Sequence, residues 1–329
     1  MIKSHVFSYN LYRWGGFNML KKKALNRIFV TTLVFFIVLV VFSIKKIGED
    51  KAVIYENDNF KTDCSVTLYT LNSNDYLSKT SIYVNKELDM LKKLEVALQA
   101  MVKDNNKNAL LPSNFNPILP NNTKVLNISL DDNIIKINFS KELLNVEKGQ
   151  EEKLIEAIVY TLTSNNINGV EIYVENALLK FIPNTSIKLP TVLTKELGIN
   201  KVYDISDSSN INKVFLLYTD SYNNFIPVTK YTNDNREKIE IVVESLSNRY
   251  LFLDNLISTL SPNLKLLNYS ITNNTISLNF NDALLVNHEI NEDYIDILSF
   301  CIFNNYDVSL AVFYVNDEKI LEKSYKSIE

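Results

Sequence analysis

KVLNISLDDNIIKINFSKELL (residues 124–144) and KLLNYSITNNTISLNFNDALL (residues 265–285) are two versions of one sequence. The second follows the first at a constant offset of 141 residues, without a gap. Further along, Tyr173-Val174 of VEIYVEN and Tyr314-Val315 of AVFYVND keep the same offset. Shared composition would give scattered identities and would not hold one register, so the chain contains an internal duplication.

Each copy contains the same order of expected elements: two strands, a helix, a hairpin, a second helix and a closing strand. Upstream, VTLYT at Val66 corresponds to FLLYT at Phe215, and KLEVALQAMV at Lys93 to KIEIVVESLS at Lys238. Apolar side chains at helical spacing mark the helices. They are Leu91, Leu94, Leu98 and Met101, then Leu154, Ala157, Ile158 and Leu162, and in the second copy Ile239, Val242 and Leu246, then Ile295, Leu298 and Ile302.

The hairpins are expected at 125–130 with 134–139, and at 266–271 with 275–280. Asp131-Asp132-Asn133 and Thr272-Asn273-Asn274 lie between these strands and are typical turn residues. This order of elements predicts an α/β fold, an α+β two-layer sandwich in which amphipathic helices cover one face of a small sheet.

A charge-free apolar run, IFVTTLVFFIVLVVFSI, predicts one transmembrane helix at 28–44. Basic residues precede the run and no acidic residue occurs before Glu49, so we expect the N-terminus in the cytoplasm and the rest of the chain outside the cell membrane. A buried core helix and a cleaved signal peptide are the alternatives. A translation start at Met1 and one at Met19 are both compatible with this topology.

The expected domain organisation follows from these features. It comprises a cytoplasmic segment 1–27, the transmembrane helix 28–44, a juxtamembrane linker 45–62, a first domain 63–183, a connector 184–212 and a second domain 213–329.

Composition excludes several classes of function. The net charge of -4 and the pI near 5.5 argue against nucleic acid as a partner. The chain has two His, two Cys and six Gly, which are too few to favour a His-based triad, a Cys/His metal site or a Gly-rich phosphate loop. We therefore expect no catalytic, cofactor-binding or metal-binding residues, no cofactor and no enzymatic activity.

The residues that could suggest chemistry have simpler interpretations. Cys301 is expected in the core, with a disulfide to Cys64 as the alternative. His288 is expected in an exposed loop. Asp131-Asp132 and Glu151-Glu152 are adjacent pairs that fit turns and helix starts better than the paired carboxylates of a glycan hydrolase. The 18 Tyr and 17 Phe could form core or a binding face, and the sequence does not separate the two.

LPNNTKVLNISLDDNIIKINFSKELL, followed by IVYTLTSN and NGVEIYVEN, resembles the GerM domain family of spore-forming Firmicutes. The resemblance extends over both copies. It implies a membrane anchor, tandem extracytoplasmic domains and a role in sporulation or spore germination. It also implies a core similar to the ring-building motif, an αββαβ module found in secretion rings, which suggests an assembly role.

Together these points predict a non-enzymatic, membrane-anchored scaffold that contacts envelope or sporulation-channel proteins and can self-associate. The alternative is a module that binds peptidoglycan or a small ligand, which would need a pocket lined with aromatic side chains and a few converging polar groups. A cell-wall hydrolase is a third possibility, for which the sequence offers no convincing set of residues.

Overall fold

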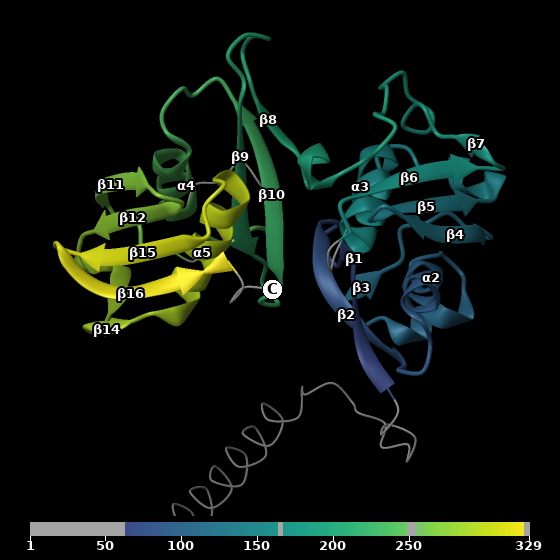
Figure 1. Cartoon of the computed structure of the whole chain (residues 1–329), viewed down its shortest axis with the longest axis horizontal. Helices are drawn as coiled ribbons and strands as arrows, with labels where there is room; N and C mark the ends of the chain where they lie inside the picture. The colour runs from purple at the N-terminus through teal and green to yellow at the C-terminus, as the bar shows by residue number, and fades with distance from the viewer. Residues whose placement is uncertain (1–62, 164–166, 249–254, 259, 326–329) are drawn as a thin grey trace, which may run out of the picture. The chain divides into compact units, whose positions relative to one another are not determined.

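The structure is a computed structural model that describes residues 63–163, 167–248, 255–258 and 260–325 (Figure 1). These residues belong to one compact unit, Lys61–Glu329. The predicted cytoplasmic segment, transmembrane helix and linker lie outside the described residues. Among the helices that are described, none has the length and apolar character needed to cross a membrane.

The first repeat contains two sheets and two helices. Strands β1 (Asp63–Asn72), β2 (Leu77–Asn85) and β3 (Phe115–Asn116) form a sheet in the order β2-β1-β3. Strands β4 (Val125–Asp131), β5 (Ile134–Phe139), β6 (Gly169–Val174) and β7 (Ala177–Leu178) form the other in that order, with β5 and β6 parallel. The helices are α2 (Met90–Ala100) and α3 (Glu151–Leu162).

The second repeat has the same plan. Its sheets are β8-β10-β9, from β8 (Val202–Asp204), β9 (Asn212–Thr219) and β10 (Phe225–Thr232), and β11-β12-β15-β16, from β11 (Leu266–Thr272), β12 (Thr275–Phe280), β15 (Leu310–Val315) and β16 (Glu318–Ser324). Helices α4 (Lys238–Ser247) and α5 (Glu292–Asn305) and a small hairpin of β13 (Leu285–Val286) and β14 (Glu289–Ile290) complete it.

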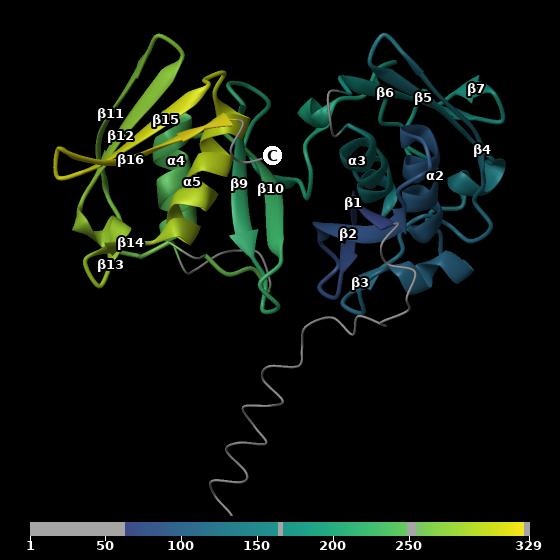
Figure 2. The ribbon, with the colours of Figure 1, turned by 60° about the horizontal axis from the view of Figure 1, so that its bottom comes forward.

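The helices of each repeat lie between its two sheets, as Figure 2 shows for α4 and α5. In the first repeat, α3 packs against both β1 and β6. Every residue of α3 from Leu154 to Leu162 is buried, as expected for a helix covered on more than one side. The predicted α/β class and the tandem repeats are confirmed. The structure adds a second sheet. The first hairpin of each repeat, β1-β2 or β9-β10, lies on the opposite side of the helices from the four-stranded sheet and does not join it.

The predicted hairpin turns explain how the repeated sequence determines the register. Asp132 and Asn133 have φ angles of 48° and 61°, and Asn273 and Asn274 have 48° and 63°. Asn and Asp tolerate this left-handed region, which two-residue hairpin turns require. The turns thereby pair Ile137 with Ile128 and Leu278 with Tyr269.

Candidate functional site

A buried polar junction joins the two repeats through Asn200. The Asn200 side chain donates two hydrogen bonds, to the carbonyl oxygens of Leu77 and Pro227, both at 2.8 Å. Its Oδ1 accepts from the Leu77 N–H at 2.9 Å. Leu77 begins β2 of the first repeat and Pro227 lies in β10 of the second. One side chain from the connector therefore satisfies three backbone groups from both repeats.

Two carboxylates and a lysine extend this junction. The Asn200 N–H donates to Glu156 Oε2 at 2.9 Å, and Lys201 Nζ lies 3.2 Å from Glu156 Oε1 and 2.8 Å from Glu152 Oε2. Burial raises the pKa of the Glu156 carboxyl, and Lys201 opposes that effect only in part. Burial alone would lower the pKa of the Lys201 ammonium, but Glu156 and Glu152 outweigh it and raise that pKa.

Further side-chain hydrogen bonds cross the same junction, and two of them involve buried donors. Asn72 Nδ2 donates to Asp220 Oδ2 at 2.8 Å, and Ser78 Oγ donates to the Phe225 carbonyl at 2.9 Å. Asn72, Ser78 and Asp220 are all buried. Asp220 also accepts hydrogen bonds from the backbone N–H groups of its own hairpin turn. Buried polar groups are costly unless paired, so these matched groups favour one arrangement of the junction.

Sequence reasoning missed this junction. Glu156 lies on α3 between Ile155 and Ala157, and the only signal was a charged residue on a helix whose other faces are apolar. Asn200 and Lys201 lie in the segment predicted as a connector, where polar residues are expected on the surface.

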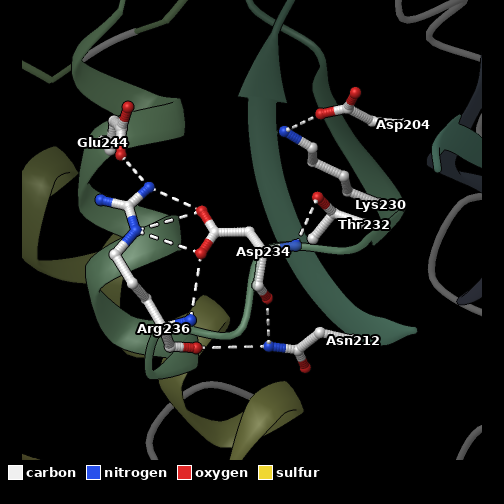
Figure 3. A network of polar contacts seen from close by, with 7 residues as sticks. All are labelled: Asp204, Asn212, Lys230, Thr232, Asp234, Arg236 and Glu244. Carbon is white, nitrogen blue, oxygen red and sulfur yellow. Dashed lines mark hydrogen bonds and ion pairs between the residues drawn. The ribbon is translucent and has the colours of Figure 1, made fainter. Parts of the chain in front are cut away.

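A second polar cluster lies at the surface of the second repeat (Figure 3). Arg236 donates to both Asp234 oxygens, with Nη2 to Oδ2 at 2.6 Å, and also pairs with Glu244 of α4. Asp234 and Glu244 raise the pKa of Arg236, and the hydrogen bond from Arg236 lowers the pKa of Asp234. Asn212 donates to the carbonyls of Asp234 and Arg236, so the cluster ties the β10–α4 loop to β9. Because Arg236 and Glu244 are exposed, these ion pairs contribute little to stability.

The structure supports the simple interpretations of the cysteines. Cys301 is fully buried on α5, and burial raises the pKa of its thiol to about 12. Such a thiol behaves as a small core residue. Cys64 is half-buried and both cysteines are free, so the alternative of a disulfide between them is wrong.

His288 and the carboxylate pairs also lie where the simple interpretations place them. His288 is exposed in the turn between β13 and β14. Asp131 pairs with Lys136 at 2.8 Å, and Asp132 forms the adjoining turn. Glu151 accepts from the Gly149 N–H in the first turn of α3. Within the described ranges, no group of three or more His, Cys, Asp or Glu side chains is placed to hold a metal ion.

One hollow of the second repeat combines aromatic and polar side chains. It has a volume of about 570 Å³. Its aromatic residues are Phe215, Phe303, Tyr306 and Tyr325, and Lys213, Lys238 and Asn305 also line it. The Phe303 and Tyr325 rings meet edge to face at 5.7 Å. A larger hollow between α4 and β11 has Tyr269 as its single aromatic residue among those described.

Comparison with known proteins connects this architecture to spore formation. The tandem GerMN domains of the sporulation protein GerM from Bacillus subtilis have the same fold, with a TM-score of 0.69, 22% identity, and coverage of 78% of this chain and 92% of that one. The spore germination protein GerM of Bacillus subtilis strain 168 is 24% identical over 248 residues, 73% of this chain and 67% of its own. Residues 67–180 match the family model Germane, described as sporulation and spore germination.

Over residues 67–180 the chain is similar to the Germane family. This match covers most of the first repeat, and the fold shared with the tandem GerMN domains extends over both repeats. The descriptions of these relatives name a process, sporulation and germination, and no reaction. The similarity supports a role in sporulation or spore germination.

Proposed function

We propose that this protein is a non-enzymatic scaffold of the cell envelope that acts in sporulation or spore germination. Residues 28–44 would anchor it in the membrane with the N-terminus in the cytoplasm, and the two Germane-like repeats would lie outside. There they would hold envelope or sporulation-channel proteins in place through protein contacts.

The observation that carries this proposal is the tandem repeat with its buried polar junction. Two similar domains tied together by Asn200 and by the Asn72–Asp220 pair present two related surfaces at a defined separation. A scaffold needs this property, because contacts made at both surfaces strengthen one another when the spacing is fixed.

Crosslinking in sporulating cells of the source organism tests the proposal. A tagged full chain is crosslinked, purified and analysed by mass spectrometry, and a chain lacking the second repeat is the control. We expect the full chain to recover envelope or sporulation-channel proteins and to restore spore formation to a deletion strain. Normal sporulation and germination in the deletion strain would overturn the proposal, as would recovery of glycan fragments alone.

A second candidate is a ligand-binding module, which the aromatic hollow of the second repeat favours. Four aromatic residues line it together with two lysines, three asparagines and two acidic residues, a combination of aromatic and polar groups that could hold a small polar ligand. Titration of the full chain with soluble peptidoglycan fragments, followed by Tyr fluorescence, tests it. Saturable binding that Phe303→Ala weakens and Phe181→Ala leaves unchanged would support the module. No change in fluorescence would exclude these fragments as ligands.

A further inference from the structure

The long sheet of each repeat has one well-protected edge and one bare edge. At one end, β7 is only two residues long and β16 carries Glu318, Lys319, Glu322 and Lys323. Short or charged edge strands are the devices by which proteins prevent strand pairing between molecules. At the other end, β4 and β11 are seven residues long, and Val125–Leu130 and Leu266–Thr272 contain no charge and no proline.

Both bare edges expose large apolar side chains at matched positions. Leu126 is 47% exposed and its counterpart Leu267 is 49% exposed, while Leu130 is 41% and its counterpart Ile271 is 45% exposed. The bulge of each strand lies at its start, between Val125 and Asn127 and between Leu266 and Asn268, so the remainder of the strand pairs regularly. Within the described residues, no strand pairs with the outer side of β4 or β11.

Charge distinguishes the two edges. Lys124 precedes β4 and Asp132 follows it, and both are exposed. When β4 is placed antiparallel to β4 of a second copy with Ile128 opposite Ile128, Asn127 lies opposite Ser129 of that copy, and Leu126, the bulged residue, lies next to Leu130. The flanking residues Lys124 of one copy and Asp132 of the other then lie at the same end of the paired strands, twice by symmetry. Such opposite-charge and apolar pairs stabilise antiparallel strands.

The edge of the second repeat lacks this complementarity. The position that matches Asp132 is Asn273, so Lys265 would have no acidic partner in a β11 pair. Pairing β4 with β11 would form one charge pair where β4 with β4 forms two.

We propose that two copies of this chain associate through β4, antiparallel and centred on Ile128, to join their four-stranded sheets across a two-fold axis. A two-fold contact is self-complementary and closes, so it predicts a dimer. The inference rests on the proposed scaffold function, for which it names the second copy as one partner.

Disulfide trapping in the full chain tests the register. The chain is purified in detergent micelles with Cys64→Ser, while Cys301 stays because it is fully buried. Asn127→Cys in one tagged copy and Ser129→Cys in another are opposite each other in the proposed register. We expect this mixture to form a crosslinked dimer on mild oxidation, at least tenfold more than the matched mixture of Asn268→Cys and Ser270→Cys.

Two outcomes would overturn the proposal. Crosslinking of Asn127→Cys with Ser270→Cys in preference to Ser129→Cys would show head-to-tail pairing of β4 with β11. No crosslink above that of the second-repeat mixture, together with a monomer by sedimentation, would exclude an edge-to-edge dimer.

A matched pair of edge variants gives a second measurement. Leu130→Lys places a charge on the proposed interface, and Ile271→Lys places it at the equivalent position of β11. We expect Leu130→Lys to weaken dimerisation at least tenfold by sedimentation and Ile271→Lys to leave it unchanged. Equal effects would count against β4. Recovery of envelope proteins is scored separately, so a wild-type chain that stays monomeric and still recovers envelope partners would overturn only this inference.

Discussion

Asn200 offers the sharpest test at the scale of a single residue. Asn200→Ala leaves the Leu77 N–H and the Leu77 and Pro227 carbonyls without their partner in a buried site. Each unpaired buried group costs about 1–3 kcal/mol, so we expect the free energy of unfolding to fall by at least about 3 kcal/mol. Urea unfolding followed by circular dichroism measures the change.

Asn223→Ala is the matched control, because it measures the cost of placing alanine at a left-handed φ without the loss of buried hydrogen bonds. Asn200 and Asn223 both have left-handed φ angles, 46° and 60°, but Asn223 is exposed in a turn. Loss of an asparagine from such a conformation alone costs about 1 kcal/mol. Equal losses in the two variants would show that the side-chain bonds of Asn200 contribute little.

Lys201 is the counter-charge of a buried carboxylate, and its removal should be costly. Lys201→Met leaves Glu156 buried without its ion pair, which we expect to lower the free energy of unfolding by about 3–5 kcal/mol near neutral pH. Lys230→Met removes an exposed pair with Asp204 and should cost less than about 1 kcal/mol. Thermal unfolding of both variants checks the difference, and comparable losses would contradict it.

The cost of Lys201→Met should depend on pH. Burial raises the pKa of folded Glu156 above its usual 4.5, and loss of Lys201 raises it further. The folded state then holds the proton more tightly than the unfolded state, so stability falls as pH rises between the two pKa values. We expect the variant to approach wild-type stability as the pH falls to about 5. A cost that is the same at about pH 5 and about pH 8 would assign the effect to packing.

Gly169 leaves room for the segment around Val192 to pack closely against β6. A Cβ on Gly169, the first residue of β6, would lie 2.4 Å from Val192 Cγ1 and 3.1 Å from the Leu193 carbonyl oxygen. We expect Gly169→Ala to cost about 1–3 kcal/mol through overpacking, and Val192→Ala in the same chain to restore part of the loss. Calorimetry of the single and double variants measures this. A double variant less stable than Gly169→Ala would contradict the steric explanation.

The elements differ in how well the sequence predicts them. The second strands of the predicted hairpins, at 134–139 and 275–280, coincide with β5 and β12, because alternating apolar residues and Asn-rich turns act locally. The two-residue β3 and three-residue β8 have no periodic pattern, and only their partners β1 and β10 define them. The second sheet was not predicted either, since pairing between strands distant in the chain leaves no local signal.

At the scale of the whole molecule, the junction should make the two repeats unfold together. Each repeat has its own apolar core, but Tyr76 of the first repeat packs against the core of the second. We expect one calorimetric transition for the wild-type chain. We expect two for the double variant Ser78→Ala/Asn200→Ala, in which the side-chain hydrogen bonds of both residues across the junction are lost. A single transition in both, or two in the wild type, would contradict this coupling.

The candidate site could be predicted from the sequence only in part, for a physical reason. Cys301 and His288 follow from local patterns, burial on a helix stripe and a place in a polar loop. The Glu156–Lys201–Asn200 network depends on where the connector lies between two sheets. No local pattern encodes that position, and the buried polar groups become recognisable only when both repeats are in place.

The position of α3 between two sheets has a consequence for hydrogen–deuterium exchange. Helix α2 buries only part of its surface, whereas α3 is buried from Leu154 to Leu162. Amides in such a helix exchange with solvent only when the surrounding structure opens as a whole. The labelling rate of a peptide spanning 154–162 would therefore report the free energy of global unfolding of the first repeat.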